Sequence, residues 1–261
     1  MPTVKADGAD IYYEIHGSGP PLLLAAGLGG AGTYWREQVP AFAAKFTTVV
    51  YDQRGTGRSS HVPVKSIEQL ADDTIRLLDA LGLERVDYLG HSTGGAIGQV
   101  LAVENPERIG RLILYATVAS NDAYRERLWG LRRKVLETMG PEHYARMTSL
   151  VLYAPQWIAE NSERLKKEEE VSASMLSKPE IMASRIASIL AFDRARDLGR
   201  IDRPTLVLCA RDDITTPAYF SEQIAAAIPG AKLTVLDFGG HGCSKTVPEE
   251  FNKIVLEFLA A

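Results

Sequence analysis

The sequence has few cysteines and no long apolar run. Cys209 and Cys243 are the only cysteines among 261 residues. This number excludes a disulfide-stabilised scaffold, and two free thiols favour a reducing, cytoplasmic location. Apolar runs such as residues 22–26 are far shorter than the roughly 20 residues of a membrane-spanning helix. Because the first ten residues also lack the apolar stretch of a secretory signal, we expect no association with a membrane.

The charge shows no excess of one sign that would indicate a polyanionic partner. The chain contains 29 Lys and Arg against 33 Asp and Glu, a formal net charge of −4. Without a basic surplus, we expect no binding to nucleic acid. Hydrophobic residues make up 46% of the chain, which excludes an intrinsically disordered protein. The length fits one large domain or two small ones, and the sequence leaves the oligomeric state open.

Short β-prone segments recur along the chain. They predict strands at residues 11–15, 22–26, 46–51, 86–89, 112–118, 205–210 and 233–236. Most of these segments are apolar throughout rather than alternating, which is typical of strands buried on both faces of a parallel sheet.

Predicted helices alternate with these strands. The helix expected at 66–81 begins with a capping box, in which Ser66 accepts a hydrogen bond from the amide of Gln69, and it ends at a glycine. Further helices are predicted at 95–104 and from Pro248 onward. The alternation predicts an α/β fold with a doubly wound, mostly parallel central sheet and helices on both faces.

One long segment breaks this alternation. Residues 119–200 contain no convincing strand and are helical in pattern and rich in charge. A loop of that length without its own structure is rare. We therefore predict a helical lid that is inserted in a core domain of residues 1–118 and 201–261 and covers one end of the sheet. A separate helical domain with no role in a site is the alternative.

A nucleophile motif lies at residues 90–94. Gly90-His91-Ser92-Thr93-Gly94 fits the pattern G-x-S-x-G, and it lies between a predicted strand and a predicted helix, as that pattern requires. A tight turn here lifts the Ser92 hydroxyl clear of the sheet, and the two glycines leave room where a Cβ would collide with backbone. We expect Ser92 to be a nucleophile; a glycine-rich turn with a capping serine is the alternative.

A serine nucleophile needs a base that an acid orients. In folds with this turn the chain order is serine, acid, histidine. His241 is the only histidine late enough in the chain, and glycines flank it. His91 adjoins the nucleophile, but we expect its side chain to point away from Ser92 and to serve packing or hydrogen bonding.

The acid is expected after the strand at 205–210. Asp213 is our prediction, because Pro217 follows four residues later, as is usual after this acid. Asp212 and Asp237 are the alternatives. Asp237 is nearer to His241 in the sequence but ends the strand at 233–236.

Two backbone amides would complete such a site by stabilising an oxyanion. One is the amide of Thr93, directly after the nucleophile. The other is that of Leu28, in the glycine-rich loop 27–32 after the first long buried strand. This loop also fits a dinucleotide fingerprint, and it lacks the lysine of a phosphate-binding Walker loop. Triad chemistry needs neither a metal nor an organic cofactor.

Aromatic and basic residues near these loops suggest a substrate pocket. Five aromatic side chains are predicted to line a small apolar pocket, although each can equally belong to the core: Tyr34, Trp35, Trp129, Tyr153 and Trp157. A basic cluster near the start of the lid would attract carboxylates, or would form a solvated helix face: Arg125, Arg127, Arg132, Arg133 and Lys134.

These residues together resemble the α/β-hydrolase family over essentially the whole chain. The resemblance rests on residues 26–28, 52–59 and 90–94, on Asp213, and on Gly240-His241. In that family the Asp-x-Arg-Gly-x-Gly stretch is structural, so Asp52 is not expected to bind a ribose. The histidine that usually precedes the oxyanion donor is replaced here by Ala26. The resemblance implies a Ser92-Asp213-His241 triad that forms an acyl-enzyme from a small-molecule substrate.

Two branches of the family are similar in more detail. The aminoacrylate (carbamate) hydrolases of bacterial pyrimidine utilisation match at residues 27–35, 51–57, 152–157 and 239–244, although members of that branch can lack the serine at the turn. The 3-oxoadipate enol-lactonases share the intact triad and a similar lid. The resemblance implies hydrolysis of an ester, an enol-lactone or a carbamate- or aminoacrylate-like compound. A cofactor-free haloperoxidase or perhydrolase, a C–C bond hydrolase and a non-catalytic receptor remain as alternatives.

Overall fold

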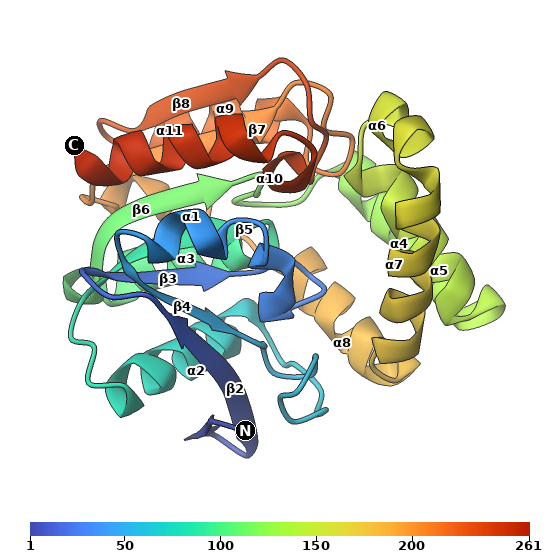
Figure 1. Cartoon of the computed structure of the whole chain (residues 1–261), viewed down its shortest axis with the longest axis horizontal. Coiled ribbons are helices and arrows are strands. Elements are labelled where there is room, and N and C mark those ends of the chain that lie inside the picture. Colours follow the sequence, from blue (N-terminus) through green and yellow to red (C-terminus); the bar gives the residue numbers. More distant parts are fainter.

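The protein is built on one eight-stranded sheet (Figure 1). The structure is a computed structural model that describes residues 1–261. The strands lie in the order β1-β2-β4-β3-β5-β6-β7-β8. Their bounds are β1 Thr3–Ala6, β2 Ala9–His16, β3 Pro21–Ala25, β4 Thr47–Tyr51, β5 Val86–His91, β6 Ile109–Tyr115, β7 Thr205–Ala210 and β8 Lys232–Leu236. The pairs β1–β2 and β2–β4 are antiparallel and the other five pairs are parallel, so the predicted mostly parallel sheet is confirmed.

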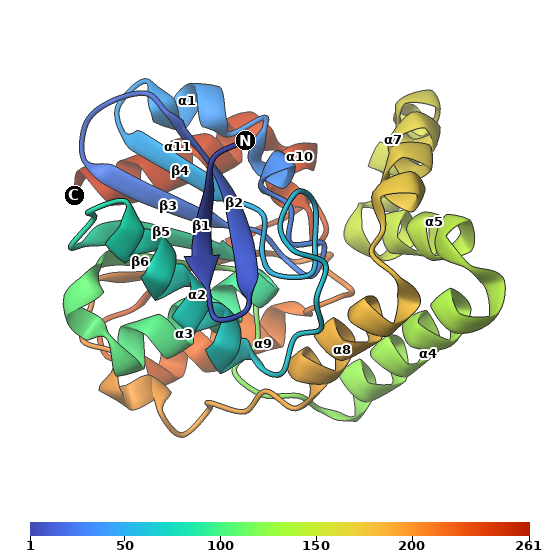
Figure 2. The same ribbon diagram turned by 90° about the horizontal axis from the view of Figure 1, so that it is seen from below.

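Helices cover both faces of the sheet (Figure 2). Their bounds are α1 Val39–Ala43, α2 Ile67–Ala80, α3 Thr93–Glu104, α4 Ala123–Met139, α5 Pro141–Leu152, α6 Pro155–Glu160, α7 Ser162–Met175, α8 Pro179–Leu190, α9 Ala218–Ala227, α10 Cys243–Thr246 and α11 Pro248–Ala260, with short 3-10 helices η1 Gly32–Trp35, η2 Pro106–Arg108 and η3 Leu198–Arg200. Helices α2 and α3 pack on one face, and α1 and α11 pack on the other. No helix is both long and apolar enough to cross a bilayer.

Two hydrophobic clusters follow from the pleat of the strands. Successive side chains of a strand point to opposite faces, so Leu23 joins a cluster of 38 buried residues while Leu22 and Leu24 join one of 18. All three side chains are fully buried. The apolar runs of the sequence are thus explained by burial on both faces, as predicted.

The C-terminal end of β6 differs from the prediction. A strand was expected to continue to residue 118, but β6 ends at Tyr115. Ala116 adopts a φ of 47°, which takes the backbone out of the extended conformation although the apolar pattern continues. Residues 116–118 remain buried against the first turn of α3 instead.

Residues 119–200 form helices α4 to α8 between β6 and β7, with no strand, as expected. We call this segment the helical insertion. It lies beyond the ends of the strands, on the right in Figure 1. Trp129 of α4 and Ile186 of α8 belong to the larger cluster of the sheet, whereas Trp157 and Leu165 form a small cluster within the insertion. The insertion is therefore joined to the core through α4 and α8, while α6 and α7 lie further out.

Candidate active site

Ser92 occupies a strained turn between β5 and α3. Its φ of 51° and ψ of −110° place it among only two non-glycine residues with a positive φ. A Cβ at Gly90 would lie 2.3 Å from the carbonyl oxygen of Gly94, and one at Gly94 would lie 2.2 Å from that of Ala25. Glycine is therefore required at both positions, and the strain is held by the surrounding backbone.

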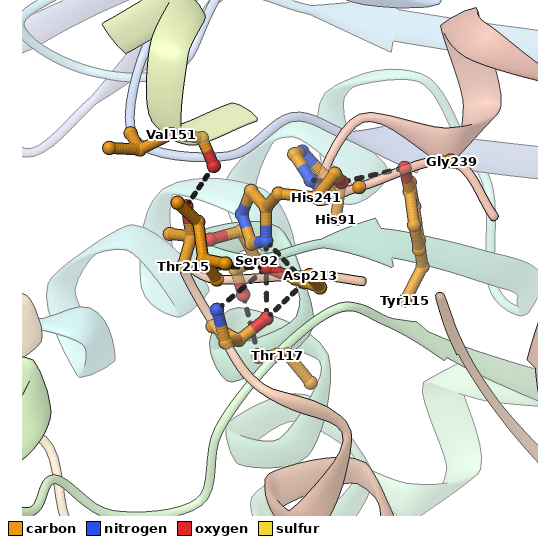
Figure 3. A network of polar contacts seen from close by, with 12 residues as sticks. His91, Ser92, Tyr115, Thr117, Val151, Asp213, Thr215, Gly239 and His241 are labelled. Carbon is orange, nitrogen blue, oxygen red and sulfur yellow. Dashed lines mark hydrogen bonds and ion pairs between the residues drawn. The ribbon is translucent and has the colours of Figure 1, made fainter. Parts of the chain in front are cut away.

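His241 and Asp213 lie together beside this turn (Figure 3). Asp213 follows β7 and His241 follows β8, and the distance between His241 Nδ1 and Asp213 Oδ2 is 2.8 Å. The same carboxylate accepts hydrogen bonds from the amides of Thr215 and Thr216, at 2.7 and 2.9 Å, and from the Thr216 hydroxyl. Because the carboxylate accepts the Nδ1 proton, the imidazole keeps Nε2 free to accept another proton.

The two alternative acids lie elsewhere. Asp212 accepts hydrogen bonds from the amides of Gly239 and Gly240, so it shapes the loop before His241 without touching the imidazole. Asp237 is exposed and faces Arg211. Of the three carboxylates, Asp213 is the one that contacts His241.

His91 and Tyr115 hold the loop of His241 through the backbone carbonyl of that residue. His91 Nε2 donates to the carbonyl of His241 at 3.1 Å, and the Tyr115 hydroxyl donates to the same oxygen at 2.8 Å. The His91 ring stacks on Tyr34 at 4.6 Å, which agrees with the expected packing role. Burial and the neighbouring His241 hold the pKa of His91 well below its usual value, so the ring is neutral. Sequence reasoning missed Tyr115, because nothing near it in the sequence marks a partner 126 residues away.

The loop after β3 presents an unused amide next to Ser92. A Cβ at Gly27 would lie 3.3 Å from the Cβ of Ser92, so the loop lies against the turn. The amide of Leu28 donates no hydrogen bond within the protein. Thr93 is the first residue of α3, whose leading amides lack acceptors in a preceding turn. Both predicted donors are thus placed beside the serine.

A cavity of about 470 Å³ opens at Ser92 and His241. Leu28, Tyr34, Trp129 and Tyr153 line it. The prediction of a small apolar pocket is wrong in one respect, because charged side chains of the insertion also line the cavity, among them Arg132 and Glu168, together with Lys245.

Two of the predicted pocket residues belong to hydrophobic cores instead. Trp35 is fully buried in the smaller sheet cluster, with its ring 6.5 Å from that of Phe251. Trp157 packs with Ala154 and Leu165 within the helical insertion. Neither lines the cavity. In both cases the neighbouring aromatic, Tyr34 or Tyr153, faces the cavity while the tryptophan turns inward.

The basic cluster divides between surface and interior. Arg127, Arg133 and Lys134 are exposed, as a solvated helix face predicts. Arg125 and Arg132 are buried and pair with no carboxylate. This division follows the helical period of α4, which turns residues seven apart to the same face.

Arg132 presents an unused donor at the cavity. One terminal nitrogen donates to the Thr148 hydroxyl at 2.9 Å, and the guanidinium lies 4.2 Å from the centre of the Trp129 ring. The other terminal nitrogen, Nη1, makes no hydrogen bond within the protein, and the Nε is buried without a partner. No group of His, Cys, Asp and Glu side chains is arranged to hold a metal ion.

Comparison with known proteins places this geometry in a family. A family model described as the alpha/beta hydrolase fold matches residues 20–244. The chain belongs to the α/β-hydrolase family. Relatives that carry the name carbamate hydrolase RutD include one from Azorhizobium caulinodans, 41% identical over 99% of this chain and 98% of the relative. Another, from a Caulobacter species, is 37% identical and covers 100% of this chain and 98% of the relative.

Solved structures of α/β-hydrolases share the whole architecture. The enol-lactonase from Burkholderia xenovorans superposes with a TM-score of 0.92, at 28% identity and over 100% of both chains. A hydrolase from Pseudomonas aeruginosa has a TM-score of 0.90 and 33% identity, and covers 99% of this chain and 97% of its own. These relatives identify this chain as a hydrolase of the same fold.

Proposed function

We propose that this hydrolase cleaves a small acyl compound bearing a carboxylate, through a Ser92-His241-Asp213 triad and an acyl-enzyme. The observation that carries the proposal is that Ser92, on its strained turn, and His241, paired with Asp213, line the same cavity. Turns of this kind store strain where a structure needs a side chain in one fixed direction.

The mechanism follows from these contacts. Ser92 Oγ attacks the acyl carbon while His241 Nε2 takes its proton, and Asp213 stabilises the resulting imidazolium. The amides of Leu28 and Thr93 stabilise the oxyanion, a contribution of about 3 kcal/mol for each donor. His241 then returns the proton to the leaving group. A water, activated by His241, hydrolyses the acyl-enzyme and restores Ser92.

Arg132 suggests the charge of the substrate. A buried guanidinium without a carboxylate partner is costly unless a ligand supplies the missing charge. Arg132 lines the cavity that Ser92 and His241 share, and its Nη1 makes no hydrogen bond within the protein. Lys245, a half-buried cation of the wall, is already paired with Glu168. Arg132 is therefore the cation best suited to bind a substrate carboxylate.

The names of the relatives favour two classes of substrate. Because the chain is 41% identical to a protein named carbamate hydrolase, we propose a carbamate- or aminoacrylate-like compound first. An enol-lactone is the second candidate, favoured by the fold-wide match to the Burkholderia enol-lactonase. The helical insertion would act as a lid, because α4, α5 and α7 contribute much of the cavity wall.

The nucleophile is tested with a serine-directed phosphonate. It should label Ser92 in the wild type and leave the Ser92→Ala variant unlabelled and inactive. A label at another residue, or full activity in the variant, would contradict the triad. Hydrolysis rates of a carbamate, an enol-lactone and simple esters would then rank the substrate classes.

The carboxylate preference is tested with a matched pair of esters. A pH-stat would compare monomethyl succinate with methyl valerate in the wild type, in Arg132→Met and in the exposed neighbour Arg133→Met as a control. A hydrogen bond to a charged group contributes about 1.5–3 kcal/mol. We therefore expect Arg132→Met to lower kcat/KM about 10- to 100-fold for the succinate ester alone. An equal loss for both esters would remove the carboxylate assignment.

A further inference from the structure

Three consecutive carbonyl groups fix the loop that carries the Leu28 amide. The carbonyl of Ala26 accepts from Gln53 Nε2 at 2.6 Å, and that of Gly27 accepts from the amide of Gly30 at 3.0 Å. The carbonyl of Leu28 accepts from Arg185 Nε at 2.9 Å. Each carbonyl shares a rigid plane with the next amide. Holding the three oxygens therefore sets the direction of the Leu28 amide, which lies in the middle plane.

Arg185 reaches this loop from the helical insertion. It lies on α8, is 1% exposed, and each of its three nitrogens donates to a neutral acceptor. Besides the carbonyl of Leu28, it donates to the carbonyl of Arg54 and to Gln53 Oε1, each at 2.6 Å. Burial lowers the pKa of Arg185 to about 10, so the side chain remains a cation at neutral pH.

Arg185 and Gln53 act on the loop as one unit. Gln53 accepts from Arg185 through its oxygen and donates to Ala26 through its nitrogen. The unit thus holds the peptide planes on both sides of the Leu28 amide. The packing around it is tight, because a Cβ at Gly30 would lie 2.9 Å from Arg185 Nη2.

We propose that Arg185, together with Gln53, is a positioning residue that directs the Leu28 amide toward the oxyanion and so couples α8 of the helical insertion to the chemical step. The inference rests on the proposed function, because it requires that the Leu28 amide stabilise an oxyanion. A displacement of α8 would then change the stability of the transition state as well as the shape of the cavity.

The test separates transition-state stabilisation from folding. Arg185→Lys keeps the charge but loses the fork of donors, and Gln53→Met removes the link to Ala26. Complete loss of one oxyanion donor lowers kcat about 10²- to 10³-fold, so we expect a misdirected donor to lower kcat about 10- to 100-fold with KM within about threefold. The affinity for a trifluoromethyl ketone, which forms a tetrahedral adduct with Ser92, should fall in parallel.

Asp73→Asn provides the matched control. Asp73 forms a buried ion pair with Arg54 at 2.6 Å, next to the same network but without contact to the loop. It should lower the melting temperature and leave kcat and ketone affinity within about threefold of the wild type. If Arg185→Lys does not fold, Gln53→Met decides the question alone.

Two outcomes would overturn the inference in distinguishable ways. If both variants lose only melting temperature, as the control does, while the phosphonate still labels Ser92 in the wild type, then the positioning role is wrong and the proposed function stands. If the wild type is not labelled at Ser92, the proposed function fails and the inference fails with it.

Discussion

Replacing Asp213 by asparagine should lower kcat on the order of 10⁴-fold while the protein stays folded. In the structure, one carboxylate oxygen accepts the amides of Thr215 and Thr216, and the other faces His241 Nδ1. An asparagine would keep its oxygen toward the two amides and turn its NH₂ group toward His241. Two donors would then face each other, and the imidazole would move its proton to Nε2.

The magnitude follows from this change of tautomer. An imidazole that carries its proton on Nε2 cannot accept the proton of Ser92, and 10⁴ in rate corresponds to about 5.4 kcal/mol of barrier. The Thr216 hydroxyl, which also donates to Asp213 in the structure, can rotate to adapt. The fold should therefore lose far less free energy than the transition state does.

The neighbouring carboxylate supplies the control. The amides of Gly239 and Gly240 donate to different oxygens of Asp212, so Asp212→Asn keeps an acceptor for one of them. Because the contact between Asp213 and His241 is untouched, kcat should fall less than about tenfold. Initial rates on one ester and thermal melting of the wild type and both variants make the comparison. A larger rate loss in Asp212→Asn than in Asp213→Asn would refute the assignment of the acid, and a collapse of the Asp213→Asn melting curve would refute the preserved fold.

Two further predictions concern packing and pH. Trp157→Ala should lower the free energy of unfolding by about 3–5 kcal/mol, because the ring is buried in the small cluster of the helical insertion. The relative hydrolysis rates of esters of increasing acyl length should stay constant. A change in these relative rates would show that Trp157 lines the cavity. Because the pKa of His91 is lowered in the folded state, the unfolded state binds its proton first as the pH falls below about 6.5, so stability decreases there. Urea unfolding at pH 7.5 and 5.5 should show a smaller decrease in His91→Gln than in the wild type, and equal decreases would show that other groups cause the effect.

Much of the fold was predictable because its signals are local. The capping box is confirmed, since Ser66 accepts from the amide of Gln69 at the start of α2. Strand β7 occupies residues 205–210, and α11 begins at Pro248, as predicted. Each of these signals depends on residues within one turn or one strand. The end of β6 was predicted less well, because the left-handed Ala116 leaves no mark on the apolar pattern.

The candidate site likewise contains residues that a local sequence signal marks and residues that no such signal marks. The glycines around Ser92 mark a tight turn through local sterics, and chain order in this fold directs attention to Asp213 and His241. The residues that hold these groups in place carry no local signal. Tyr115 contacts the carbonyl of His241 across 126 residues, and Arg185 contacts that of Leu28 across 157.

Tyr34 and Trp35 show most directly what tertiary structure alone decides. The sequence determined that both follow the glycine-rich loop and that aromatic side chains there are partly or fully buried. Only the packing of η1 against distant segments decided that Tyr34 faces the cavity while Trp35 lies in the core beside Phe251. Hydrophobicity favours the burial of an aromatic side chain, but the direction in which it points depends on which remote residues fill the space around it.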